Sequence, residues 1–327
     1  MSDIDATWPH GSQDAIGQAA EFLVWSNLIT QSAGGLHIFL PMLDRGIDAV
    51  VHRLSDHAYL AVQVKGKTVV QHHEAPIGVF ENHLFTPDQL VIGVHLDGER
   101  LGPFVLVADA STFKEKAARI ENRGRVLLVA DMPTHPIPGH KWSEDLVPFD
   151  QLAKRLGAGA YVPTASLVVG AVSDEDSVFG FRGEQEVIRR LAMLEDCGLF
   201  RPFPDNETAE ILIRRLATGA TLATQVKTGR LAMAHARIKI QVNRSNFVAD
   251  PTTIVVVLAW LLSERRFHET CLVIPAEVLP SLSARVGRYY ELNFRPAGSR
   301  ESSRLDSYRV PLESLADTVS KKLVGLS

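Results

Sequence analysis

The chain of 327 residues is 46% hydrophobic and 22% charged, a composition typical of a globular protein large enough for two domains, which excludes a disordered chain. Its longest apolar run, Thr253 to Leu262, is far shorter than the roughly 20 residues that span a bilayer, and residues 1–10 lack a signal pattern, so we expect a cytoplasmic protein without a membrane segment. The formal net charge of −4 lacks the basic excess that proteins coating nucleic acid usually carry.

The first half of the sequence predicts a helix followed by strands. Apolar residues at helical spacing, from Ile16 to Leu28, indicate an opening helix that ends at a glycine. Later, Val147-Pro148 opens another segment with helical spacing. This order predicts an α/β domain over residues 1–156, with a mixed central sheet flanked by helices. The expected strands of this half are 37–40, 47–52, 58–64, 90–96, 104–108 and 126–129.

The second half, residues 179–327, repeats this pattern after an expected linker. Residues 157–178 mix Gly, Ala and Ser with an acidic end, and Ser166 to Val169 are expected to pair with a sheet edge. The two cysteines, Cys197 and Cys271, are far apart in apolar surroundings, so we expect buried thiols rather than a disulfide. The expected strands of this half are 210–213, 222–226, 254–258, 270–274 and 290–294.

Several distances along the chain occur in both halves. Glu21 and Glu184 each lie four residues after a glycine and seven before a leucine. Asp48 and Glu210 each lie fifteen residues before the glutamine of a Gln-Val-Lys tripeptide. From each helix glutamate to the proline that opens the last helical segment is 127 residues. Chance rarely preserves several distances together, so the sequence predicts a tandem duplication.

Four polar side chains come together in the fold expected for the first half. Gln63 and Lys65 lie two residues apart on one strand and therefore face the same side, where Asp48 on the neighbouring strand can reach both. Glu21 on the preceding helix adds a second carboxylate. Carboxylate and amide oxygens beside the Val64 backbone carbonyl suit a hard cation such as Mg²⁺ or Mn²⁺.

The order of a helix Glu, a strand Asp and then Gln-x-Lys resembles the PD-(D/E)XK nuclease superfamily, in particular its Mrr-like and Holliday-junction-resolvase-like branches. The resemblance implies two restriction-endonuclease-like domains and a Mg²⁺- or Mn²⁺-dependent phosphodiesterase that cleaves DNA. It implies that Asp48 is the central metal ligand, assisted by Glu21 and Gln63, and that Lys65 activates water and stabilises the transition state. It also implies a place in restriction or antiphage defence, with protein partners from such a system.

The second half departs from this motif at one position. Glu210, one methylene longer, stands in place of the aspartate, while Glu184, Gln225 and Lys227 match the other three residues. Small octahedral ions tolerate little change in ligand geometry, so we expect the better site in the first half and a widened DNA-binding surface in the second. Basic residues of this half that would serve to face DNA are Arg189, Arg190, Arg214, Arg215, Arg237 and Lys239, with a solvated helix or strand face as the alternative interpretation.

Two alternatives stay open at this point. In the first, the duplicated fold is a catalytically inactive scaffold that binds nucleic acid or a partner protein, and Asp48 and Lys65 form a charge pair without a metal. In the second, the spacing is accidental and the chain has an unrelated α/β fold, with Asp48 and Lys65 on opposite sides of the sheet. The positions of these two side chains test the second alternative, and metal binding tests the first.

Overall fold

The structure is a computed structural model that describes residues 10–43, 45–68, 70, 72–97, 100–122, 124–159, 174–203, 209–233, 235–244, 247–298 and 303–326. The chain divides into two compact units, unit 1 (Met1–Val162) and unit 2 (Pro163–Ser327). Within the described ranges, no helix combines the length and the apolar character needed to cross a bilayer.

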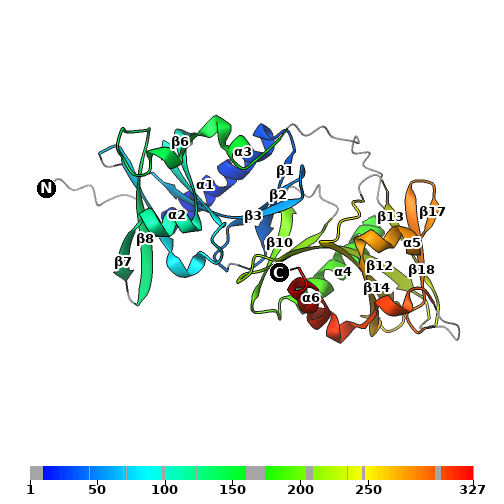
Figure 1. Ribbon diagram of the computed structural model, residues 1–327. Helices are drawn as coiled ribbons and strands as arrows, with labels where there is room; N and C mark the ends of the chain where they lie inside the picture. The colour runs from blue at the N-terminus through cyan, green and yellow to red at the C-terminus, as the bar shows by residue number, and fades with distance from the viewer. Residues whose placement is uncertain are drawn as a thin grey trace. The chain divides into compact units, whose positions relative to one another are not determined.

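Unit 1 is built on a mixed sheet with the strand order β1-β2-β3-β5-β6-β9 (Figure 1). Strands β3 and β5 are parallel, and the other neighbours are antiparallel. A smaller antiparallel sheet has the order β4-β8-β7. The bounds are α1 His10–Gln31, β1 Leu36–Pro41, β2 Ala49–Arg53, β3 Ala58–Lys67, β4 Glu74–Phe80, η1 Glu81–His83, β5 Leu90–Asp97, β6 Arg100–Asp109, α2 Ala110–Lys116, β7 Ala118–Asn122, β8 Arg125–Pro133, η2 Ser143–Asp145, β9 Leu146–Pro148, η3 Phe149–Gln151 and α3 Leu152–Arg155.

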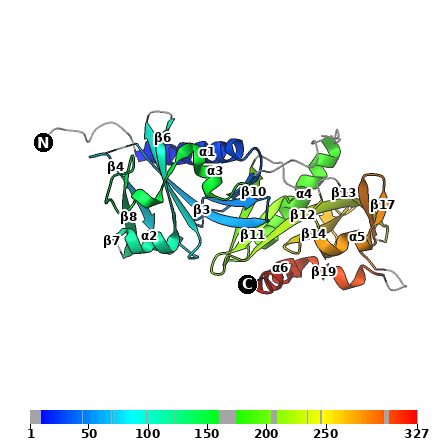
Figure 2. The same ribbon diagram turned by 45° about the horizontal axis from the view of Figure 1, so that its top comes forward.

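Helices and the smaller sheet cover the two faces of the main sheet in unit 1. Helices α1 and α3 pack on one face, and α2 with the smaller sheet packs on the other (Figure 2). Alternation along the strands separates the two cores, because Val62 and Val64 of β3 pack toward α1 whereas Val91 of β5 packs toward α2. The polar side chains that alternate with the two valines, Gln63 and Lys65, therefore belong to the face away from α1.

Unit 2 has the same arrangement of strands as unit 1. Its main sheet has the order β10-β11-β12-β14-β16-β19, with β12 and β14 parallel, and its smaller sheet has the order β13-β18-β17. Helix α4 packs on β12 and contacts α6, while α5 and the smaller sheet share the core on the opposite face. The bounds are α4 Asp174–Leu191, β10 Cys197–Phe203, β11 Ile211–Arg215, β12 Thr221–Leu231, β13 Ile238–Asn243, β14 Thr253–Leu261, β15 Arg266–Phe267, β16 Thr270–Pro275, η4 Ala276–Val278, α5 Leu279–Leu282, β17 Ala284–Val286, β18 Tyr289–Phe294, η5 Asp306–Tyr308, β19 Arg309–Pro311, η6 Leu312–Ser314 and α6 Leu315–Val324.

The mixed α/β architecture is confirmed, and each expected strand overlaps a strand of the structure, although residues 126–129 and 290–294 lie in the smaller sheets rather than in the central ones. Three further local predictions need correction. The acidic end of the expected linker instead opens α4, because acidic residues favour the first turn of a helix, and Ser166 to Val169 lie outside the described residues. Helix α4 does not end at a glycine, since Gly198 lies within β10. The segment at Val147-Pro148 begins as β9, because its backbone pairs with β6, and turns helical only afterwards.

The opening helix of each unit crosses its sheet at a position where one partner must be glycine. In unit 1 a Cβ on Gly66 of β3 would clash with the Cβ of Ala20 on α1. In unit 2 the glycine is on the helix, and a Cβ on Gly183 of α4 would clash with the Thr228 Oγ1 of β12. Each helix position directly precedes the helix glutamate, and each strand position directly follows the Gln-Val-Lys tripeptide. Both units therefore allow the helix to approach the sheet closely, unit 1 through a glycine on the strand and unit 2 through a glycine on the helix.

We predict that Gly66→Thr destabilises unit 1 and that Ala20→Gly partly restores it. Overpacking a tight contact costs about 1–3 kcal/mol, whereas the double variant reproduces the helix Gly and strand Thr of unit 2. The gain is partial because glycine inside a helix costs about 1 kcal/mol. Urea denaturation of both variants measures the change in the free energy of unfolding. A double variant less stable than Gly66→Thr contradicts the packing account.

The two cysteine thiols are buried and do not form a disulfide with each other, as expected. Burial raises the pKa of Cys197 to about 11 and that of Cys271 to about 12. Because the reactive thiolate forms only as pH rises toward these values, we predict that neither thiol reacts appreciably with a disulfide reagent at pH 8 in the folded chain. Absorbance of the released thiolate measures the rate, with urea-unfolded protein as the control. A native rate equal to the unfolded rate contradicts this prediction.

Candidate functional site

An aspartate caps a backbone amide where β2 and β3 of unit 1 separate. The ladder between these strands extends to the Asp48 N–H, which donates to the Val62 carbonyl at 3.1 Å. Beyond it, the Asp48 carboxylate accepts from the Val64 N–H, with 2.8 Å between Oδ2 and N. The same oxygen is 3.1 Å from the Lys65 Nζ. The side chain of Asp48 thus replaces a backbone acceptor and holds the lysine in one place.

This ion pair is only partly open to solvent. The side chains of Asp48 and Lys65 are 14% and 31% exposed, so their attraction is stronger than that of a fully solvated pair. Both contacts use Oδ2, and no described residue donates a hydrogen bond to Oδ1. The pair places both side chains on one side of the sheet, so the placement on opposite sides that was expected for an unrelated fold is not found.

A buried amide oxygen lies beside this pair. Gln63 is 2% exposed, and its Oε1 has no hydrogen-bond partner among the described residues. Gln225, at the matching position of β12, is 6% exposed and also has an Oε1 without a partner in the described part of the chain. A buried carbonyl oxygen without a partner costs about 1–3 kcal/mol, so finding one at the same position twice calls for a physical explanation.

Unit 2 repeats the capping geometry with a longer acid. The Glu210 N–H donates to the Thr224 carbonyl at 3.0 Å, as in unit 1. Glu210 then accepts from the Val226 N–H at Oε2, at 2.7 Å, and from the Lys227 Nζ at Oε1, at 3.1 Å. Both carboxylate oxygens are therefore engaged, whereas Asp48 engages one. Burial raises the pKa of the Glu210 carboxyl above its ordinary value, although Lys227 acts in the opposite direction.

The helix glutamates lie on α1 and α4, which pack against β3 and β12. Glu21 follows Ala20, the residue that meets Gly66 beside Lys65, so it lies near this end of β3. Glu184 forms an ion pair with Arg201, at 3.3 Å. In the described ranges, no three His, Cys, Asp or Glu side chains are grouped to hold a metal ion. A metal in unit 1 would therefore depend on amide or backbone oxygens as well as on carboxylates.

The residues expected to face DNA do not form one open basic surface. Arg214 is 3% exposed, and its guanidinium donates to the Gly219 carbonyl and to Thr221. Ion pairs with carboxylates engage four of the others, which are Arg189, Arg190, Arg215 and Lys239. A phosphate contact by Arg214 is excluded because its side chain is buried. Its sequence position in a β-strand gave no sign of this burial.

We predict that Gln63→Leu raises the free energy of unfolding by about 1 kcal/mol in metal-free buffer. The substitution keeps the volume similar and removes the buried oxygen that has no partner. Urea denaturation in the presence of a chelator measures the change, and Gln225→Leu should behave alike. A decrease for both variants means that these oxygens are satisfied in the folded chain.

Comparisons with known proteins add little to this geometry. The sequence matches no protein-family model, and no curated protein is significantly similar to it. Among solved structures, the chain is similar to a bacterial homing endonuclease, I-Ssp6803I, with 17% identity and a TM-score of 0.33 over 47% of this chain and 97% of that chain. A score of this size does not establish a shared fold.

Proposed function

We propose that the chain is a Mg²⁺- or Mn²⁺-dependent nuclease that hydrolyses phosphodiester bonds of DNA, with its catalytic site in unit 1. Asp48, Glu21, Gln63 and the Val64 carbonyl would hold the metal, and Lys65 would act beside it. The observation that carries the proposal is the orphaned Oε1 of Gln63 next to the Asp48–Lys65 pair. A buried oxygen without a protein partner is the kind of group that a hard cation satisfies.

The donor set fits such an ion. Asp48 keeps Oδ1 without a hydrogen bond from any described residue, and Gln63 keeps Oε1. These are hard oxygens on adjacent strands, and the carboxylate supplies the negative charge. A bound Mg²⁺ or Mn²⁺ would polarise the scissile phosphate and lower the pKa of a coordinated water.

The protein's own residues contribute position and charge. Asp48 is fixed by the Val64 N–H, so its carboxylate is oriented before any ligand binds. Lys65 lies 3.1 Å from Asp48 and is 31% exposed, which leaves the ammonium access to a substrate phosphate. There it would orient the attacking water and stabilise the negative charge that develops in the transition state. Its cation also offsets the charge of Asp48 while no substrate is bound.

We further propose that the two units arose by tandem duplication of a PD-(D/E)XK-like domain. The identical strand order and the repeated capping by Asp48 and Glu210 support this origin. Unit 2 would bind substrate without catalysing its hydrolysis, because both oxygens of Glu210 are already engaged. A metal there would have to displace a backbone amide or Lys227 from the carboxylate.

A second candidate function is that of a non-catalytic scaffold for nucleic acid or a partner protein. The direct Asp48–Lys65 ion pair favours it, since the two charges satisfy each other without a metal. Titration with Mn²⁺ separates the two candidates. The nuclease requires binding that Asp48→Asn and Gln63→Leu weaken and Gln225→Leu does not, whereas the scaffold requires none.

We predict that Lys65→Ala lowers the rate of metal-dependent DNA cleavage by about 10²–10³, the usual loss when one preorganised group beside the developing charge is removed. Asp48→Asn should cost at least as much, because it also weakens the metal. Single-turnover cleavage of plasmid, linear and single-stranded DNA at saturating Mg²⁺ measures the rates. Thermal transitions confirm that each variant is folded.

The matched variants in unit 2 are the control for this prediction. Lys227→Ala and Glu210→Ala should leave the cleavage rate largely unchanged and weaken DNA binding in a salt-sensitive way. Loss of cleavage in these variants, with cleavage retained in Lys65→Ala, would move the catalytic site to unit 2. Absence of cleavage by the wild-type chain on every substrate would favour the scaffold.

A further inference from the structure

A pocket of about 730 Å³ opens in unit 2 on the helix-covered face of the main sheet. Its walls come from the last turns of α4, the β14–β15 hairpin and the beginning of η6. Trp260 lines it and alternates with Ala259 and Leu261, which belong to the core on the opposite face. Lys227 pairs in register with Val257 of that opposite core. The pocket and the Glu210–Lys227 pair are therefore on different sides of the sheet.

A carboxylate on α4 organises two arginines at one wall. Glu186 is 14% exposed and accepts from Arg189 at both oxygens, at 2.9 Å, and from the Arg190 Nε at 2.7 Å. Burial raises the pKa of Glu186, but the hydrogen bonds from the two arginines outweigh it, so the pKa lies below its ordinary value. One negative and two positive charges leave this wall with a net positive charge at neutral pH.

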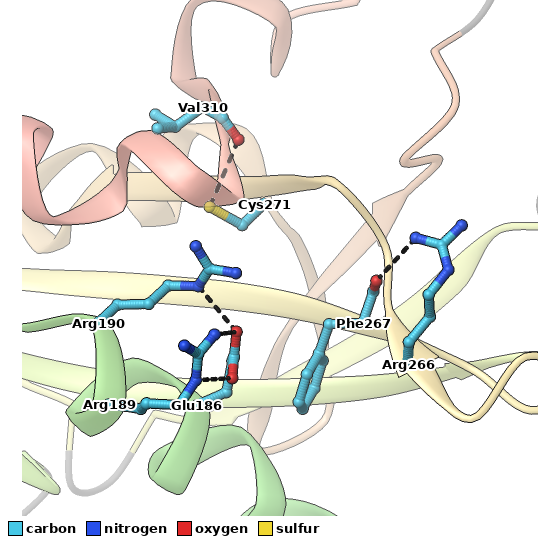
Figure 3. Close-up of polar contacts among 7 residues, drawn as sticks. All are labelled: Glu186, Arg189, Arg190, Arg266, Phe267, Cys271 and Val310. Carbon is cyan, nitrogen blue, oxygen red and sulfur yellow. Dashed lines mark hydrogen bonds and ion pairs between the residues drawn. The ribbon is translucent and has the colours of Figure 1, made fainter.

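Arg190 is the less exposed arginine of the pair, and some of its N–H groups are not used by Glu186. Its side chain is 21% exposed, against 65% for Arg189. Only Nε is used by Glu186, and neither Nη1 nor Nη2 has a hydrogen-bond partner among the described residues. Figure 3 shows these two nitrogens extending from α4 toward Cys271. A guanidinium with two free parallel N–H groups matches a phosphate in a bidentate manner.

Aromatic rings form the neighbouring wall. Trp260 and Phe267 pack edge to face, with ring centroids 4.9 Å apart and an angle of 76° between the rings. Both are only partly buried, and both line the pocket. Its volume falls within the range of about 300–1,000 Å³ that is usual for small-molecule sites, far more than one phosphate needs. The arrangement suits a ligand with a flat ring and an anionic group.

Unit 1 shows that the fold does not require this charged cluster. Counting from the matching helix residues Glu184 and Glu21, the positions of Glu186, Arg189 and Arg190 are occupied in α1 by Leu23, Ser26 and Asn27. Leu23 packs against the apolar core of unit 1. An apolar residue thus serves at the position where unit 2 keeps a largely buried carboxylate. The aromatic pair Trp260 and Phe267 is likewise replaced in unit 1 by an aliphatic pair, since Leu96 and Leu101 occupy the matching hairpin positions.

We propose that this pocket binds a nucleoside phosphate, with the phosphate on the Arg190 guanidinium and the base against Trp260 and Phe267. The ligand chemistry is that of a free nucleotide or of the phosphorylated end of a nucleic-acid strand. The site lies outside the proposed metal cluster of unit 1. Nucleotide binding in this pocket does not depend on the proposed nuclease activity.

Calorimetric titration of the full chain with adenosine monophosphate tests the proposal. We expect one site per chain, and Arg190→Gln should weaken binding about tenfold or more, because a charge-assisted bidentate contact is lost. Adenosine without phosphate should bind more weakly by a similar factor. Phe267→Leu should weaken the nucleotide about fivefold or more and leave the binding of inorganic phosphate unchanged. Wild-type affinity in Arg190→Gln, or equal affinity for adenosine and its monophosphate, overturns the proposal.

Two control variants test whether a loss of affinity is specific to the pocket. Arg237→Gln removes an exposed arginine of unit 2 outside the pocket and should bind like the wild type. Lys65→Ala should also bind like the wild type, which keeps the result separate from catalysis. If Arg190→Gln does not fold, as judged by its thermal transition, Arg190→Lys retains the charge without the fork and should still lose affinity.

Competition identifies the source of the ligand. Displacement of the monophosphate by a 5′-phosphorylated single-stranded oligonucleotide, and not by its 5′-hydroxyl counterpart, supports the end of a strand. Retention of the monophosphate against both oligonucleotides supports a free nucleotide. No binding of either the monophosphate or the phosphorylated oligonucleotide at millimolar concentration overturns the proposal.

Discussion

Both units depend on a side chain that takes over a backbone hydrogen bond. Where β2 leaves β3, and where β11 leaves β12, the next amide of the central strand would face a missing acceptor. A carboxylate supplies it and binds the lysine one residue further along. Leaving a buried amide unsatisfied costs about 1–3 kcal/mol, so the stability of the fold itself favours a carboxylate at this position. A charged pair at a half-buried position is thus a structural necessity before it has any chemical role.

One methylene group, the difference between aspartate and glutamate, determines how many carboxylate oxygens remain without a hydrogen bond in each unit. Asp48 is short enough that both donors meet at a single oxygen, whereas Glu210 reaches far enough to give each donor its own. The buried amide oxygens of Gln63 and Gln225 are left without protein partners in either case. Unit 1 therefore retains two unengaged oxygens of different side chains for a cation, and unit 2 retains one.

The sequence predicted the main sheets well, because their strands are apolar runs that are buried on both faces. It did not predict β10 of the main sheet in unit 2. It also did not predict β4, whose residues Pro76 and Gly78 are typical of turns, or β13, whose alternation of Ile238, Ile240 and Val242 with polar residues was a usable signal. The polar motif was recognisable from spacing alone. The orphaned amide oxygens, the burial of Arg214 and the pocket around Arg190 depend on contacts between distant segments, which no local pattern contains.

The alternating placement of glycine in the two units bears on how a chain with two such similar halves avoids misassembly. Exchange of equivalent elements between neighbouring homologous units is a characteristic folding error. If α1 packed on β12, Ala20 would meet Thr228 and the helix could not approach the sheet. If α4 packed on β3, Gly183 would meet Gly66 and leave a void. Each helix therefore fits only its own sheet, and this steric mismatch disfavours an exchange of helices between the two units during folding.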